Sequence, residues 1–377
     1  MAFSNNERER REKAMRAIMQ ARGLAALILF GDVCSGNDFY GDFRYYTDNR
    51  IITSRQVAAL FPDKEPVLLV GSAIQRQAAS RRSSIRDCRH TETMMLDLAK
   101  VLKERGLSGG KVGVNFEVLP VTWHEHLKGE FSGVEWVHTH QEVLEARFLR
   151  SPEEADIFRK SGLLADGSFE AAARMIAPGV SEYEIAAAIE GYARARGAEE
   201  HFTLIGSGRF VPGDANGLPL PYSPSPRRVE AGDSVVMEIT PRVEGYWTQL
   251  VRTVNVGTPN PELEKLFRVS RDSIAKGLER LKAGARVKDV VEAITAYVTG
   301  CGLLPRPPYG HICGVDLIEQ RVSAENERAL TAGTAVIIHP TVFSADGKNS
   351  FFWGETYLVT DGGWEPLNHA SSDLLTV

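Results

Sequence analysis

Two histidines and two glutamates interrupt apolar segments in the second half of the sequence. Glu238 lies in VVMEIT, His311 in YGHICG, His339 in VIIHPTVF and Glu355 in GETYLVT. A buried carboxylate or imidazole costs free energy unless a partner or a ligand satisfies it, so these positions favour a polar site. Imidazole titrates near neutral pH, and we therefore predict that His311 and His339 act as an acid/base pair. Glu238 and Glu355 are the predicted carboxylates that orient the rings and tune their pKa values.

Polar and aromatic side chains crowd the same segments and are predicted to contact a small substrate. The guanidinium of Arg252, in TQLVRT, suits either a substrate carboxylate or a structural role, and both remain open. Alternation along a strand sends some aromatic rings into the core and leaves others to line a pocket. The predicted substrate contacts in these segments are Gln249, Arg252, Tyr246, Trp247, Tyr309 and Trp353.

The stretch from Gly232 to Gly257 is the element that must position several of these side chains. Residues 235–239 form an apolar strand, residues 241–245 supply turn residues, and residues 246–256 alternate into a second strand. We therefore predict two adjacent strands that carry Glu238 and Gln249.

The rest of the chain predicts two domains, 1–147 and 148–377. Helical and apolar strand patterns alternate through the first, which indicates an α/β domain. Ser151 and Pro152 begin a helix at the boundary, and SEYE from Ser181 is a capping box for the next helix. Two further helices at 261–281 and 288–300 precede the histidine segments, so the pattern by itself indicates an α+β second domain with a large sheet.

Taken together, these motifs resemble the creatinase/prolidase/aminopeptidase P-like family, also called peptidase M24, over the full chain. The resemblance implies a C-terminal pita-bread domain and a smaller N-terminal creatinase-like α/β domain. In metal-using members two aspartates, one histidine and two glutamates hold two metal ions that activate water. The matching positions here are Glu238, Gln249, His311, His339 and Gly354. Only the histidine is retained, so we expect no two-metal centre.

Creatinase-type members place a histidine base in a loop before the strand pair, and here that loop is VPGDANGLP. Asp214 and Asn216 stand near the position, and no histidine does. Val251 replaces a glutamate that grips a guanidinium group, so creatine is not an expected substrate. The resemblance also implies a homodimer in which the N-terminal domain of one protomer lies near the site of the other, with Arg50 or Arg55 contacting substrate.

These observations predict a metal-independent, creatinase-like hydrolase or lyase that is not a peptidase. It would cleave a C–N or C–C bond in a small, carboxylate-bearing and partly aromatic molecule, and no cofactor is expected. One alternative is a mononuclear metal-dependent M24 peptidase or lyase, with one ion on Glu238, His311 and His339. The other is a non-catalytic binding module, in which the proline-rich loop VPGDANGLPLPYSPSPRR binds a partner. For His311 and His339 separately, the alternative interpretation is a buried histidine satisfied by its hydrogen bonds.

Composition narrows the class of protein further. The chain has 377 residues, 25% of them charged, with a net charge of −5. No basic domain stands out, which argues against binding to nucleic acid or acidic membranes. Neither a signal peptide nor a run of about 18 apolar residues is present. The four cysteines, Cys34, Cys88, Cys301 and Cys313, are widely spaced, so we predict no disulfides and no zinc site. This cysteine usage is typical of the reducing cytoplasm, and we predict that location.

Overall fold

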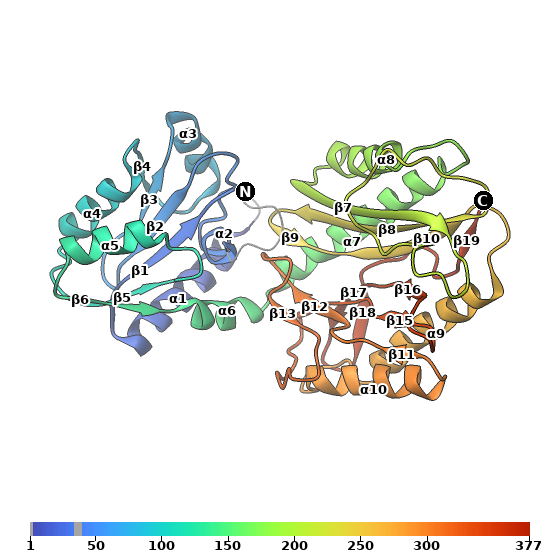
Figure 1. The fold of residues 1–377 in the computed structure, drawn as a ribbon. Helices are drawn as coiled ribbons and strands as arrows, with labels where there is room; N and C mark the ends of the chain where they lie inside the picture. Colours follow the sequence, from blue (N-terminus) through green and yellow to red (C-terminus); the bar gives the residue numbers. More distant parts are fainter. Residues whose placement is uncertain (1–2, 34–39) are drawn as a thin grey trace. The chain divides into compact units, whose positions relative to one another are not determined.

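The computed structural model describes residues 3–33 and 40–377 and divides the chain into two compact units. The units are Met1–Leu149 and Arg150–Val377 (Figure 1). The predicted domain boundary at 147/148 remains a prediction. Cys34, one of the cysteines used above, lies outside the described residues.

The first unit is a six-stranded mixed sheet with helices packed against it. The strand order is β4-β3-β2-β1-β5-β6, and β2 pairs antiparallel with both β1 and β3. The central strand β1 is buried on both faces, with Ala26, Ile28 and Phe30 on one face and Leu27 and Leu29 on the other. The strands are β1 (Leu24–Gly31), β2 (Gln56–Leu60), β3 (Val67–Val70), β4 (Asp87–His90), β5 (Gly110–Val114) and β6 (Val134–His138). The helices are α1 (Asn5–Arg22), α2 (Gly41–Thr47), α3 (Ala73–Arg82), α4 (Met94–Glu104), α5 (Val121–Glu130) and α6 (His140–Phe148).

The helices of the second unit begin where the sequence indicated. Ser151 and Ser181 each form a capping box that starts a helix, and Asn260 caps a third. The four helices are α7 (Pro152–Ala173), α8 (Glu182–Ala195), α9 (Pro261–Leu278) and α10 (Val287–Gly300). In Figure 1, α7 and α8 cover one side of this unit and α9 and α10 cover the opposite side, with the strands between them.

Three sheets lie between these helix layers. Their strand orders are β19-β10-β8-β7 with β9 on β8, β13-β12-β14-β17-β18, and β11-β15-β16. A bridge between Val251 and Gly354 connects the first two sheets. The strands are β7 (Glu200–Arg209), β8 (Asp233–Val243), β9 (Tyr246–Trp247), β10 (Leu250–Asn255), β11 (Leu304–Pro305), β12 (Gly310–Cys313), β13 (Gln320–Arg321), β14 (Ala335–Ile338), β15 (Thr341–Phe343), β16 (Ser350–Phe352), β17 (Glu355–Val359), β18 (Trp364–Pro366) and β19 (Leu375–Thr376).

The predicted strand pair is β8 and β10, but its turn is shorter than predicted. β8 continues to Val243, and the turn is confined to Glu244 and Gly245, which both adopt positive φ. Two residues with positive φ match the twist of the flanking strands, so the chain reverses without the longer turn at 241–245.

Alternation along β8 and β10 decides which side chains face the helices. Val235, Met237 and Ile239 of β8 pack with Leu250 and Val254 of β10 in the core beneath α7 and α8. Successive side chains point to opposite faces of a sheet. Glu238 and Val251, which are opposite each other in the register, therefore face the interior between the helix layers.

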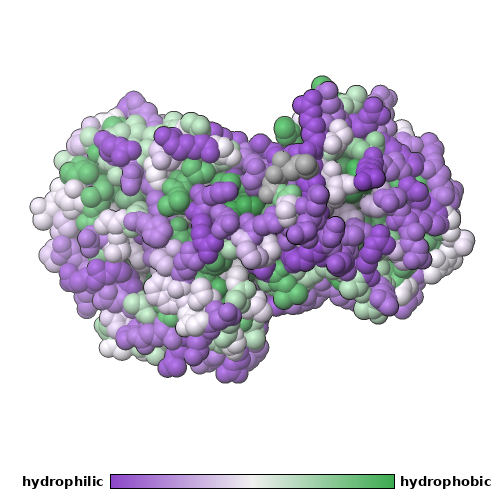
Figure 2. All heavy atoms as spheres, turned by 180° about the vertical axis from the view of Figure 1, so that it is seen from behind, coloured by the Kyte–Doolittle hydropathy of each residue, from purple (hydrophilic) through white to green (hydrophobic). Residues whose placement is uncertain are grey.

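Hydrophilic residues cover most of the face shown in Figure 2, and hydrophobic residues appear there in separate patches. Among the described residues, no helix combines the length and the apolar character needed to cross a bilayer.

Candidate functional site

Glu238 is the titratable group that β8 places on the interior face. Burial raises the pKa of Glu238 to about 7, and a hydrogen bond with the Gln249 side chain partly opposes this rise. Gln249 is itself fixed by its backbone, because its N–H donates to Thr356 Oγ1 at 2.8 Å and its carbonyl accepts from the same hydroxyl at 2.9 Å. The structure therefore brings Glu238 and Gln249 together, and near pH 7 the carboxyl group is divided between its two protonation states.

His311 and His339 lie side by side, as predicted. His311 on β12 is opposite Ile337 of β14, and His339 follows two residues later on the same face. The ring centroids are 5.4 Å apart at 68°, and Phe352 of β16 packs edge-on against the His339 ring at 5.1 Å. The His339 backbone N–H donates to the Tyr309 carbonyl at 2.8 Å.

Both imidazoles are held in the neutral form at pH 7. Burial lowers the pKa of His339 to about 4. Burial also lowers the pKa of His311 well below its usual range, and the neighbouring His339 adds to this effect. Within the described residues, His311 Nδ1 and Gln249 Oε1 are buried without a hydrogen-bond partner. Buried polar atoms of this kind are normally satisfied, so both are available to a ligand.

Gly354 explains how His339 is accommodated. A Cβ atom at position 354 would overlap the His339 side chain and the Ile338 carbonyl oxygen. The Gly354 carbonyl accepts from Val251 N–H at 2.8 Å, which holds this close approach of β10 to β17. His339 and Gly354 are therefore a matched pair, and a side chain at 354 requires the backbone to shift.

This donor set does not fit the two-metal centre that the resemblance implies. Gln249 supplies a neutral amide and Gly354 supplies no side chain at all. Among the residues that the structure describes, no three His, Cys, Asp or Glu side chains are grouped so as to hold a metal ion. The single-ion alternative on Glu238, His311 and His339 also finds no such group.

Arg252 and Glu355 lie on the other face, which corrects two predicted roles. Arg252 Nη2 pairs with Glu355 Oε2 at 2.6 Å, and the Tyr357 hydroxyl donates to Glu355 Oε1 at 2.7 Å. Arg252 also donates to the carbonyls of Val251, Gly354 and Ser371 at 2.9–3.0 Å. Glu355 is opposite Ile338, whereas Thr356 is opposite Ile337 on the histidine face. One residue of register thus turns Glu355 away from the rings, and Arg252 is a structural residue.

The four predicted aromatic contacts are buried and engaged in packing. The Tyr246 hydroxyl donates to Glu154 at 2.7 Å, and Trp247 lies 5.1 Å from the Arg242 guanidinium. The Tyr309 hydroxyl pairs with Thr295 Oγ1 at 2.9 Å, and the Arg252 guanidinium lies 4.5 Å from the Trp353 ring. These contacts place the four rings in the core, which corrects the prediction that they line a pocket. Among the described residues, the Trp353 indole Nε1 is nevertheless buried without a hydrogen-bond partner, as are His311 Nδ1 and Gln249 Oε1.

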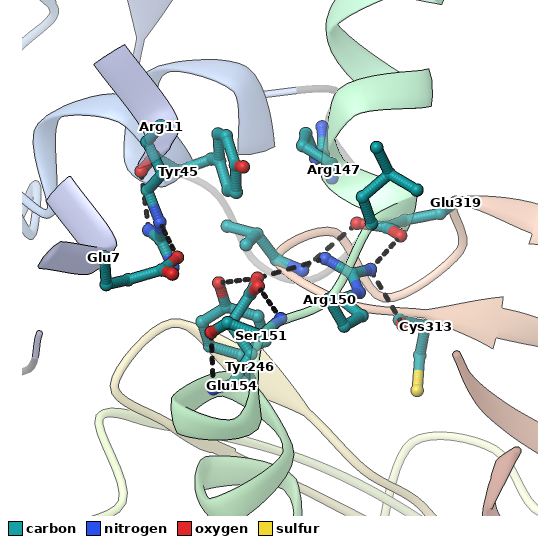
Figure 3. A network of polar contacts seen from close by, with 12 residues as sticks. Glu7, Arg11, Tyr45, Arg147, Arg150, Ser151, Glu154, Tyr246, Cys313 and Glu319 are labelled. Carbon is teal, nitrogen blue, oxygen red and sulfur yellow. Dashed lines mark hydrogen bonds and ion pairs between the residues drawn. The ribbon is translucent and has the colours of Figure 1, made fainter. Parts of the chain in front are cut away.

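A buried arginine anchors the strand that carries His311. Figure 3 shows Arg150 between the Glu319 carboxylate and the Cys313 carbonyl, with the Ser151 and Glu154 capping contacts beside it. Arg150 Nη2 lies 3.4 Å from the Cys313 oxygen, at the end of β12. An ion pair without solvent exposure fixes this end of β12 to the start of α7.

The remaining predicted contacts lie in two other places. Asp214 and Asn216 are exposed in the loop after β7, where the Asn216 N–H donates to Asp214 Oδ1 at 2.9 Å. Arg50 and Arg55 belong to the first unit. Arg55 pairs there with Asp32 at 2.7 Å.

Sequence reasoning missed two residues that organise the site. Thr356, rather than Glu355, shares the histidine face and holds Gln249 through both of its backbone groups. Asn349, in the turn between β15 and β16, binds the loop that contains Asp214. Alternation along the strand that leads to His339 cannot identify Thr356, because Thr356 belongs to another strand. Only the β14–β17 register shows that Thr356 is opposite Ile337.

Comparison with known proteins gives two family matches that together cover most of the chain. Residues 156–361 match the model of metallopeptidase family M24. Residues 11–149 match the creatinase/prolidase N-terminal domain.

Individual relatives are similar in sequence along much of their length. The chain is 28% identical to a creatinase of Bacillus sp. (strain B-0618) over 363 residues, which is 92% of this chain and 86% of the relative. It is 27% identical to a Xaa-Pro dipeptidase of Pyrococcus horikoshii over 262 residues, or 68% of this chain and 73% of the relative.

Solved structures confirm the predicted fold class. The Xaa-Pro dipeptidase from Bacillus anthracis superposes with a TM-score of 0.83 at 21% identity, covering 98% of this chain and 100% of that one. The prolidase from Pyrococcus horikoshii OT3 gives 0.84 at 22% identity, with 97% and 99% coverage. At these identities the likeness establishes the fold alone: a pita-bread domain preceded by a smaller N-terminal domain.

The comparisons also correct the predicted function. The prediction of a metal-independent hydrolase or lyase that is not a peptidase is wrong, because the second unit matches a metallopeptidase model and the relatives include Xaa-Pro dipeptidases. The family matches support an enzymatic function, and they favour the alternative prediction of an M24 peptidase over the leading prediction.

Proposed function

Because the chain belongs to metallopeptidase family M24, we propose that it is a peptidase that hydrolyses the amide bond of a small, dipeptide-sized substrate. The family match over residues 156–361 and the likeness to Xaa-Pro dipeptidases support this proposal. Glu238 and His339 are partly exposed, so a substrate can reach them from solvent, whereas His311 is buried behind them at a ring separation of 5.4 Å from His339.

The proposal depends above all on Glu238, because burial raises the pKa of its carboxyl group to about 7. A general base is most effective when its pKa lies near the working pH. Ionised Glu238 takes a proton from water as the water oxygen attacks the amide carbon. The C–N bond then breaks, and Glu238 returns the proton to the leaving nitrogen. The neutral rings of His311 and His339 each make a hydrogen bond to the backbone, at Leu317 and at His339 itself. The unpaired Nδ1 of His311 is then an acceptor for the attacking water or for a substrate N–H.

The donor set fits no two-metal centre, so these steps use only side chains of this chain. The same misfit favours a second candidate function, a non-catalytic binding module. Gly354, which supplies no side chain at a family ligand position, is the observation in its favour.

A dipeptide panel that includes Xaa-Pro substrates tests the proposal. Wild-type protein is expected to hydrolyse at least one member, and Glu238→Gln is expected to lower kcat by about 100-fold or more. Chelator treatment and readdition of single divalent cations, run in parallel, measure whether turnover depends on a metal. Binding of dipeptides without turnover under any of these conditions would replace the peptidase with the binding module.

Assembly and location remain proposals that rest on the family resemblance. We propose a homodimer in the cytoplasm, and the absence of a membrane-spanning helix among the described residues is compatible with that location. Light scattering of the purified chain should give twice the 41.5 kDa of one protomer. A monomeric mass would reject the dimer.

A further inference from the structure

A single buried side chain holds the loop that follows β7. Asn349 is 4% exposed, and its Nδ2 donates to the carbonyls of Val211 at 3.0 Å and Asp214 at 3.1 Å. Its Oδ1 accepts from Gly213 N–H at 2.6 Å. The Asn349 backbone is fixed in turn, because its N–H donates to Ser344 Oγ and its carbonyl accepts from Ser344 N–H. Both amide hydrogens and the amide oxygen are thus committed to the loop backbone.

The far end of this loop returns to β7. Ile205 and Tyr222 exchange two backbone hydrogen bonds of 2.8 and 3.1 Å. A Cβ atom on Gly208 would overlap the Gly217 carbonyl oxygen, so the loop lies directly against the strand. β7 is also the neighbour of β8, and its Leu204 is opposite Glu238. One end of the loop is therefore attached beside the strand that carries the proposed base.

The Asn349 end is attached to the hairpin whose Phe352 contacts His339. Phe352 follows Asn349 by three residues along β16, a rise of about 10 Å in an extended strand. Its ring packs on His339 at 5.1 Å. Loop 211–217 thus connects the Glu238 sheet to the hairpin that supports His339.

We propose that Asn349 is a positioning residue and that loop 211–217, which it holds, determines the specificity of the site. This inference rests on the proposed peptidase function. The loop side chains of Val211, Asp214 and Asn216 are exposed, so the loop has no hydrophobic core of its own to fix its shape. Without the amide clamp its backbone gains conformational freedom, and the groups it presents to a substrate lose their fixed positions.

Two substitutions at one position separate the clamp from general stability. Asn349→Ala removes all three contacts. Asn349→Asp keeps an acceptor for Gly213 N–H but turns a carboxylate oxygen toward the Val211 and Asp214 carbonyls, so its effect should be at least as large. Asn260→Ala is the control, since it removes the N-cap of α9 and lowers stability without touching the loop.

Hydrogen exchange and dipeptide kinetics are the readouts. In both Asn349 variants, amides of residues 211–217 should exchange at least tenfold faster, KM should rise about tenfold with kcat within threefold, and the ranking of dipeptides should change. Asn260→Ala should leave loop exchange, KM and ranking unchanged despite a lower Tm. The pH profile of kcat should not move in any variant, because Glu238 keeps its surroundings.

Each result bears on a separate part of the inference. Unchanged loop exchange in Asn349→Ala would overturn the clamp. A released loop with unchanged KM and unchanged ranking would overturn the positioning role. A wild type that turns over no dipeptide would reject the proposed function and the specificity role with it, while faster loop exchange would still establish the clamp.

Discussion

At the scale of single residues, burial shifts the pKa values of the site's titratable groups in opposite directions: it raises that of the carboxyl group and lowers those of the imidazoles. Glu238 is held toward its protonated form and both histidines toward their neutral forms. The interior is thus close to uncharged below neutral pH, as expected where desolvation outweighs nearby charges.

Glu238 should make the protein less stable as pH rises toward neutrality. Its pKa is about 7 in the folded chain and 4.5 ordinarily, so the folded state binds more protons between these values. Its contribution is fully present below about pH 4.5 and is lost as pH rises through 7, up to about 3 kcal/mol. Urea unfolding of wild type and Glu238→Gln from pH 4.5 to 8 measures this difference. Parallel pH profiles for the two proteins would contradict it.

His339 should have the opposite effect. Its pKa is about 4 in the folded chain against 6.5 ordinarily, so the unfolded state binds more protons between these values. Stability is fully present above pH 6.5 and falls as pH drops toward 4, by up to about 3 kcal/mol. His339→Gln should therefore unfold less readily in acid, relative to its own stability at pH 7, than wild type does. An acid limb of unchanged steepness would show that other groups control it.

At the scale of elements, the register between strands decides which side chains meet. β8 and β10 place Glu238 opposite Val251, and β14 and β17 place Thr356 opposite Ile337. The close approach of Gly354 to Ile338 and His339 at the end of β14 then requires glycine, because His339 occupies the space of a side chain there. The matched pair of His339 and Gly354 belongs to the packing of strands and not to either residue alone.

Arg252 is expected to stabilise the packing of these strands and not to bind substrate. Its guanidinium is 1% exposed and joins Glu355 to carbonyls of β10, of Gly354 and of the C-terminal segment. Arg252→Ala leaves Glu355 without its cation and should cost about 3–5 kcal/mol of unfolding free energy. Chemical denaturation measures the loss, and KM of the fraction that remains folded should stay within threefold of wild type. A variant of wild-type stability with a greatly raised KM would restore Arg252 as a substrate contact.

At the scale of the whole molecule, each of the two units has its own core. The six-stranded sheet of the first unit and the layered strands of the second are built separately, as in chains of this length. The groups proposed for catalysis all come from the second unit, and they are drawn from β8, β12 and the residue after β14.

Fold class and family could be predicted from the sequence, and so could the proximity of His311 and His339. Capping residues at Ser151 and Ser181 and apolar strands around Glu238 and His311 are local signals, since caps and alternation act within a few residues. Such signals located the helices and the strands that carry the site.

The neighbours that complete the site are evident only in the folded chain. Glu355 and Arg252 stand close in sequence to site residues, yet one step of register turns them to the opposite face, where they pair with each other. Thr356 and Asn349 enter through contacts with residues more than 100 positions away. No local pattern encodes such contacts, because strand register is fixed by packing across the whole sheet.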